Sequence, residues 1–459
     1  MRFQQVSGNW TEGAAGWRRY ARYVAVWLCL TATPCLPVEP NQVTVMGDAS
    51  GSVRGFAAAS SKQLKAIYRL VLRVAAEGQV RLCAMRHRGG QQDFIQPVAG
   101  NNVDPFGDPS FYAGDTPLAD AVSRLTGDPA NSTAIVITDG MESEGYAVRL
   151  RGTMESVVAH GWGAWLLMVR LSFDGLYFSE QHVGSAHLER LREAVRKVNA
   201  EWTVDPPRGH SDDKCVQAGT CFWFRGLRPL LILVLARDPA NGRNLAMQVG
   251  SDLRREPLPE PKVLTVELAP LHERGIAVSH YSAAGEAGEG LVVQSGNSLQ
   301  PVLECYAGQG PQTKKVVTAV RWEQAPLPFE QPCRERWLHA VEKKPGWVQA
   351  VTPSASFNTS AAPEQQGTIE VAFLAAKPGT LARWLGQAGE YDQPLVFKLS
   401  TQLELSSDAR WWDQWSADTS WETPHLVFRL RELVRSTAQA ALKRKNAQPK
   451  VVQMRVAFH

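Results

Sequence analysis

Apolar runs and amphipathic stretches alternate along the first half of the chain. The apolar runs lack the polar alternation of half-exposed strands, so we expect strands that are buried on both faces. The stretches between them carry apolar residues at a spacing of three or four, which predicts helices. The predicted strands are 43–48, 79–87, 132–140, 164–171 and 228–236, and the predicted helices are 60–78, 116–125, 154–161, 187–202 and 242–253. This alternation predicts an α/β fold of the Rossmann-like kind, with a doubly wound, mostly parallel sheet.

The pattern changes after a proline-rich segment, RREPLPEPK, at 254–262. Short apolar runs follow, separated by Gly, Pro and Ser, and this texture is typical of an antiparallel sandwich or barrel. We therefore expect an α/β domain at 40–255 and a β-rich, sandwich-like region at 262–459, made of one or two small units.

Residues 1–39 form a separate segment in which Arg18, Arg19 and Arg22 precede a short apolar stretch. That layout is typical of a signal peptide, and Cys35 after it could carry a membrane tether, although Pro34 is a poor match to the usual small residue. The alternative is an N-terminal extension or a buried strand that stays with the protein. The first interpretation places the protein in the periplasm or cell envelope, and the second in the cytoplasm.

Composition limits the classes of partner. The chain has 459 residues, 44% of them hydrophobic and 20% charged, as expected for a folded protein of more than one domain. Its 49 basic and 45 acidic residues nearly balance, which gives no reason to expect nucleic acid as a partner. The longest apolar runs are too short for an integral membrane span. Cys215 and Cys221, close together in a loop-like stretch, are the best disulfide candidates if the protein is exported.

Oxygen-bearing side chains follow the predicted strands of the α/β domain. Asp48, Ser50 and Ser52 come after the first strand, Thr116 opens a helix, and Asp139 follows the apolar run AIVIT at 134–138. In a doubly wound sheet these loops meet at the carboxyl edge, where such folds bind ligands. A set of carboxylates and hydroxyls suits a hard cation, Mg²⁺ or else Mn²⁺ or Ca²⁺.

The segments DASGS (48–52), GDTPLADAV (114–122) and IVITDG (135–140) resemble the three motifs of the metal-ion-dependent adhesion site (MIDAS) in von Willebrand factor type A (VWA) domains of bacterial type. The resemblance covers about 40–255 and implies that Asp48, Ser50, Ser52, Thr116 and Asp139 hold the metal. It also implies a non-enzymatic, adhesion-like protein-binding module, in which an Asp or Glu of the partner completes the metal shell. Asp115 is the one departure, since bacterial relatives often have glycine there.

Other functions remain open at this point. Relatives of the fold also serve as intracellular scaffolds or regulatory subunits beside AAA-type ATPases or in bacterial conflict (defence) systems, and in a third case the metal would only stabilise the fold. A hydrolase is disfavoured, because GDASGS has no G-x-S-x-G context and the histidines are scattered. Trp411, Trp412, Trp415 and Trp421 could form a binding platform, but we favour packing in a core.

Overall fold

The computed structural model describes most of the chain from residue 42 onward, and the predicted signal segment lies outside the described residues. The described ranges are 42–76, 78–86, 94–140, 147–178, 184–205, 214–260, 262–268, 277–284, 292–294, 302–307, 313–323, 330, 332–343, 348–357, 364–375, 395–405, 412–417, 423–445 and 451–458.

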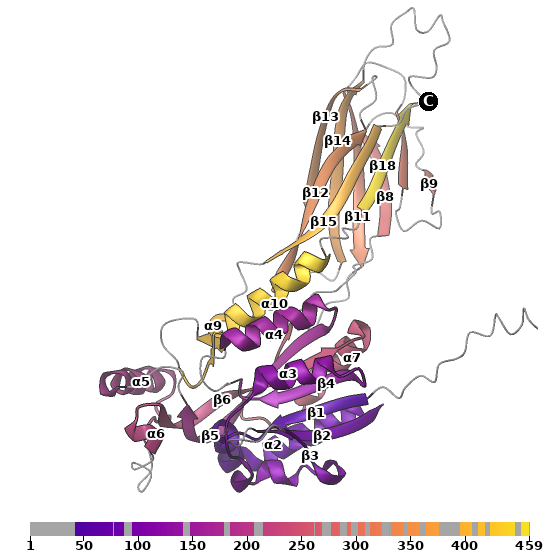
Figure 1. Cartoon of the computed structure of the whole chain (residues 1–459). Coiled ribbons are helices and arrows are strands. Elements are labelled where there is room, and N and C mark those ends of the chain that lie inside the picture. The colour runs from indigo at the N-terminus through magenta and orange to yellow at the C-terminus, as the bar shows by residue number, and fades with distance from the viewer. Residues whose placement is uncertain are drawn as a thin grey trace, which may run out of the picture. The chain divides into compact units, whose positions relative to one another are not determined.

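An open, mixed sheet of 7 strands forms the centre of the α/β part, in the order β3-β2-β1-β4-β6-β5-β7 (Figure 1). The strands are β1 (Gln42–Asp48), β2 (Gln79–Met85), β3 (Ile95–Pro97), β4 (Asn131–Thr138), β5 (Gly163–Phe178), β6 (Cys221–Ala236) and β7 (Leu264–Glu267). The α/β class is confirmed. β7 lies beyond residue 255, where we expected the α/β domain to end, and it pairs with β5.

The prediction of a mostly parallel sheet is wrong. Only the pairs β1–β2 and β1–β4 are parallel, whereas β2–β3, β4–β6, β5–β6 and β5–β7 are antiparallel. Two of the four antiparallel pairs are made by β6, which lies between β4 and β5 and runs opposite to both. An apolar run without alternation shows only that a strand is covered on both faces, and it does not give the direction of the strand.

Helices cover both faces of the sheet, and each face has its own apolar core. α2 (Arg54–Ala75) and α7 (Pro239–Leu253) pack on the side of Val43 and Val45. α3 (Leu118–Gly127) and α4 (Ala147–Ala159) pack on the side of Met46 and Val136. Successive side chains along β1 and β4 point to opposite faces of the sheet, so each strand contributes residues to both cores. The other helices in this half are α5 (Ser185–Val198), α6 (Lys214–Gln217) and the 3₁₀ turns η1 (Gly51–Val53), η2 (Ala99–Asn101), η3 (Asp104–Gly107) and η4 (Pro109–Phe111).

α2 begins six residues before the expected start. We expected Ser60 or Ser61 to cap it, but the helix starts at Arg54 and Ser60 instead marks a kink, with φ −135° and ψ 33°. The Ser60 hydroxyl donates to the carbonyl of Ser172 on β5 at 2.9 Å. This hydrogen bond ties the kink to the strand below it, which explains why a serine stands inside the helix.

β5 and β6 are each 16 residues long and pair along their full length. Because β4 ends at Thr138 opposite Leu231, the part of β6 before Leu231 continues past the carboxyl edge of β4, together with the last half of β5. We call this two-stranded extension, 170–178 with 221–229, the ribbon. The ribbon extends beyond the edge of the sheet at which β1 and β4 end.

Two further sheets lie beyond residue 276, with the orders β12-β15-β18-β10-β9 and β13-β14-β11-β8. Their strands are β8 (Ala277–Ala284), β9 (Val292–Gln294), β10 (Val302–Ala307), β11 (Thr313–Glu323), β12 (Cys333–Lys343), β13 (Val348–Phe357), β14 (Glu364–Ala375), β15 (Leu395–Leu405) and β18 (Val451–Phe458). The short strands β16 (Ser416–Ala417) and β17 (Val427–Phe428) pair with each other.

The helix α10 (Leu430–Lys445), preceded by the short α9 (Trp412–Trp415), returns to the α/β core. It lies beside α4 (Figure 1), and its Leu430 and Val434 belong to the apolar cluster that contains Met154 of α4. Trp415 is fully buried in the same cluster, in line with packing rather than a binding platform. The other three tryptophans of that group lie outside the residues whose side chains are described. No helix in the described part of the chain has the length and apolar character needed to span a bilayer.

Candidate metal centre

Asp48 ends β1 and is fully buried. Its Oδ1 accepts a hydrogen bond from the backbone N–H of Ser50 at 2.9 Å, and its Oδ2 accepts one from the hydroxyl of Thr138 at 2.7 Å. Thr138 ends the neighbouring strand β4, and its hydroxyl also accepts from the N–H of Gly140. Both carboxylate oxygens are thus oriented by the ends of adjacent parallel strands.

The hydroxyls of Ser50 and Ser52 lie side by side, with 3.0 Å between the two Oγ atoms. Ser50 is 1% exposed and Ser52 6%. Extended backbone at Ser50, with φ −74° and ψ 167°, followed by the 3₁₀ turn η1, brings both side chains to one side of the loop. The alternating acid and hydroxyls of the sequence therefore form one cluster, as expected.

Thr116 stands two residues before α3 and is 4% exposed. Its loop is fixed to the Asp48 loop by two backbone hydrogen bonds: Gly51 N–H donates to the carbonyl of Gly114 at 3.0 Å, and Ala113 N–H donates to the carbonyl of Ala49 at 3.0 Å. Gly114 has φ +80°, a conformation that favours glycine. The second predicted segment thus lies directly against the first, and Asp115, the departure from the family pattern, is exposed.

Asp139 follows β4 and forms a buried ion pair with Arg228 of β6. The Nη2–Oδ2 distance is 2.9 Å, and the exposed fraction is 0% for the Asp139 side chain and 2% for that of Arg228. Arg228 also donates through Nη1 to the carbonyl of Ser52 at 3.2 Å. One guanidinium therefore connects the first predicted segment to the third.

Burial, together with the negative charge of Asp139, raises the pKa of Asp48 to about 7, against the lowering effect of the hydrogen bonds from Ser50 and Thr138. A carboxylate in this position lacks compensating positive charge. Arg228 neutralises one of the two acids, so a further cation would be favoured here.

The donor set fits a small divalent cation. At Mg–O distances of 2.0–2.1 Å, neighbouring corners of an octahedron lie about 2.9 Å apart, close to the 3.0 Å between the Ser50 and Ser52 hydroxyl oxygens. Carboxylate and hydroxyl oxygens are the ligands that hard cations prefer. The described residues contain no group of three or more His, Cys, Asp or Glu able to hold a metal, but a site of two carboxylates and three hydroxyls does not require one.

Sequence reasoning missed Arg228 and Thr138. Thr138 lies inside the segment IVITDG, so its hydroxyl was within the motif but was assigned only to the strand. Arg228 begins the apolar run 228–236, where a charged residue at a strand end is ordinarily taken to be in solvent. Only the ribbon, which continues the strand past Arg228 and covers it, makes this arginine part of the site.

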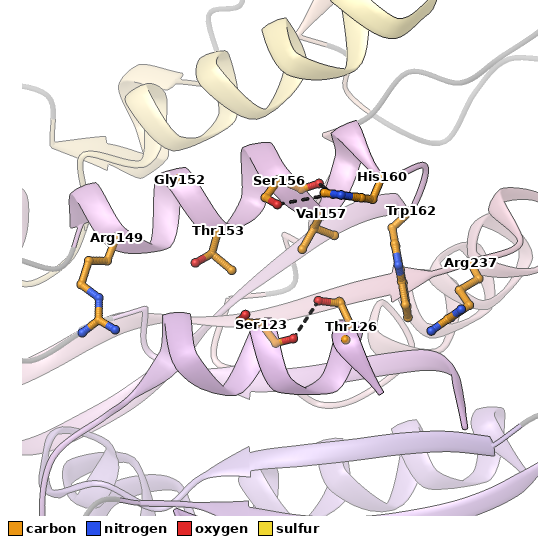
Figure 2. A pocket seen from close by; sticks show the side chains of 11 residues that line it. Ser123, Thr126, Arg149, Gly152, Thr153, Ser156, Val157, His160, Trp162 and Arg237 are labelled. Carbon is orange, nitrogen blue, oxygen red and sulfur yellow. Dashed lines mark hydrogen bonds between the residues drawn. The ribbon is translucent and has the colours of Figure 1, made fainter. Parts of the chain in front are cut away.

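A groove of about 700 Å³ lies between α3 and α4, away from the Asp48 cluster (Figure 2). Arg149 and Arg237 stand at its two ends, with hydroxyl side chains between them. Both arginines are already engaged: Arg149 contacts Asp120, and Arg237 donates to the carbonyls of Asn131 and Asp128. Because both arginines already have partners, the groove is a weaker candidate site for a charged ligand than the sheet edge at Asp48.

The chain matches no protein-family model, and no similar curated protein or solved structure was found.

Proposed function

We propose that the protein is a non-enzymatic, metal-dependent protein-binding module of the VWA type. In this proposal the carboxyl edge of the sheet is a MIDAS-like site for Mg²⁺, or for Mn²⁺ or Ca²⁺, lined by Asp48, Ser50, Ser52, Thr116 and Asp139. The observation that supports it most is the convergence of the buried Asp48 carboxylate with two adjacent serine hydroxyls. The antiparallel β6 is a difference from the doubly wound sheet that the resemblance implied, but it leaves the parallel strands β1 and β4, which position Asp48 and Asp139, in place.

Charge balance indicates the class of partner. Ionised Asp48 and Asp139 with Arg228 give a net charge of −1, so a divalent cation brings the site to +1. A carboxylate from an Asp or Glu of a protein partner would neutralise this remaining charge and supply an oxygen ligand. When bound, the cation would bridge the two proteins, and residues of this chain would hold it in place.

We also propose a cell-envelope or periplasmic location. Cys215 and Cys221 form a disulfide, with 5.3 Å between their Cα atoms. Disulfides persist mainly in oxidising compartments. This bond favours the adhesion-like interpretation over an intracellular scaffold.

The partner class is tested with Mn²⁺ and a pair of peptides. Bound Mn²⁺ speeds the relaxation of water protons, and a ligand that displaces its water reduces the effect. We expect a short peptide with a central Glu to reduce the enhancement and its Gln counterpart to leave it unchanged. Equal effects of the two peptides would contradict carboxylate recognition, and Asp48→Ala should show no enhancement to reduce.

A further inference from the structure

The Arg228–Asp139 ion pair is an unusual feature for a cation site, because it places a permanent positive charge beside the acids. Arginine stays protonated in proteins, so this charge cannot be removed by a proton loss. The guanidinium is also held in place: its Cζ lies 4.7 Å from the ring centre of Tyr177, 4.9 Å from that of Phe173 and 5.7 Å from that of Phe56.

The pair places one oxygen of Asp139 beside a fixed positive charge. Oδ2 is 2.9 Å from Nη2 in a charge–charge contact without hydrogen-bond geometry, with both side chains out of solvent, and Nη1 donates at the same time to the carbonyl of Ser52. For Oδ2 to turn towards a cation it would have to leave a guanidinium that lies among aromatic rings. Separating a buried charged pair is strongly unfavourable.

We propose that Arg228 is a positioning residue that keeps Asp139 outside the direct ligand shell of the metal. This inference rests on the proposed metal-dependent function. The cation is then bound by Asp48 and the hydroxyls of Ser50, Ser52 and Thr116, which supply only one negative charge. It is bound less tightly than it would be with two acidic ligands, and it keeps a position open for the carboxylate of the partner.

The expected effect of losing Arg228 is a gain in metal affinity, the opposite of a simple loss of function. Replacing Arg228 by a neutral residue frees the charge of Asp139 and removes a like charge from beside the metal, so binding of the metal should become tighter. We expect Arg228→Gln to bind Mn²⁺ at least about tenfold more tightly than the wild type in isothermal titration. Arg228→Lys keeps a positive charge near Asp139 and should therefore gain less affinity than Arg228→Gln. Affinity in Arg228→Gln equal to or weaker than that of the wild type would overturn the proposal.

A second variant covers the case in which Arg228→Gln does not fold. The double variant Asp139→Asn, Arg228→Gln replaces both members of the pair by neutral groups of similar size, which buried pairs often tolerate. If Asp139 is outside the metal shell, Mn²⁺ affinity should remain within about threefold of the wild type. A loss of about tenfold or more would show that Asp139 is itself a ligand, and the role of Arg228 would be overturned.

The full chain is used throughout, and its folding is checked by circular dichroism before each titration. Wild-type protein that binds no Mn²⁺ would overturn the proposed function and this inference together. Wild-type binding that Asp48→Ala abolishes, combined with the wrong response of the Arg228 variants, would overturn only the inference. The two failures are therefore distinguishable.

Discussion

Gly55 and Gly175 bring the backbones of α2 and β5 into direct contact. A Cβ on Gly175 would lie 2.8 Å from the Cα of Gly55, and one on Gly55 would lie 2.5 Å from the Phe173 ring. This close approach holds the ribbon against the start of α2, directly after the Ser50–Ser52 loop. Arg228 of the ribbon can reach the carbonyl of Ser52 because nothing larger than a hydrogen separates the two elements at this point.

Substitution of Gly175 by alanine should therefore destabilise the protein. Since the obstacle is backbone and cannot rotate away, we expect Gly175→Ala to lower the free energy of unfolding by about 1–3 kcal/mol, as for other overpacked sites. Denaturant unfolding measures this. Gly152 of α4 is the matched control, because a Cβ there would meet nothing within 4 Å. Gly152→Ala should raise stability by about 0.5–1 kcal/mol through helix propensity, and equal losses in both variants would contradict the packing argument.

The C-terminal helix α10 should be essential to the stability of the α/β core. Val434 is fully buried in the cluster shared with α4, so Val434→Asp buries a carboxylate among apolar side chains. We expect a loss of about 3 kcal/mol or more in thermal or denaturant unfolding. Arg435 is the adjacent exposed residue, and Arg435→Asp should change stability by no more than about 0.5 kcal/mol. Similar stability of the two variants would show that α10 is only loosely attached.

Reduction of the Cys215–Cys221 disulfide should weaken the protein modestly. The two residues are 6 apart in sequence, and closing a loop of this size in the unfolded chain corresponds to about 2 kcal/mol. Unfolding in the presence and absence of a reductant measures the effect. The double variant Cys215→Ser, Cys221→Ser should show the lower stability in both conditions, and a remaining effect of reductant there would point to another disulfide.

His425 should make stability depend on pH below neutrality. Burial, together with the positive charge of Arg170, lowers its pKa from 6.5 to about 4, and its ring lies 5.7 Å from that of Trp202. Between these two values the unfolded chain binds a proton that the folded protein does not. The share of the free energy of unfolding that depends on His425 is therefore fully present above pH 6.5 and is lost as the pH drops towards 4.

At pH 5 the lowered pKa of His425 reduces the free energy of unfolding by at most about 2 kcal/mol. The free energy of unfolding is measured at pH 7.5 and pH 5 for the wild type and His425→Gln. Between these two pH values the variant should lose up to about 2 kcal/mol less than the wild type. His160 is exposed, so His160→Gln should follow the wild type. An equal pH response in the wild type and His425→Gln would remove His425 as the cause.

The parts of the fold that could be predicted are those determined by local pattern. The strands around Val45, Ile135 and Ile232 are continuous apolar runs, and in the structure all three residues are almost fully buried. The first site cluster was also predictable, because Asp48, Ser50 and Ser52 are close in sequence and their geometry follows from one short loop.

The remainder depends on contacts between distant segments. Residues 172–178 alternate between half-exposed and buried up to Tyr177, which resembles a surface strand, and only pairing with 221–227 extends β5 into the ribbon. The burial of Arg228 and its contact with Asp139, 89 positions earlier in the chain, follow from this long-range pairing. The start of α2 was misplaced for a similar reason, since Ser60 bonds to Ser172 and does not cap a helix.

The divalent-cation site at Asp48 is tested by titration of the full chain with Mg²⁺ and Mn²⁺, using the wild type, Asp48→Ala and Asp115→Asn. Asp115 is an exposed acid next to Thr116, so its variant controls for a general loss of negative charge near the site. We expect one cation bound per chain by the wild type and by Asp115→Asn, and none by Asp48→Ala. Cation binding that survives in Asp48→Ala, or that is absent from the folded wild type, would contradict it.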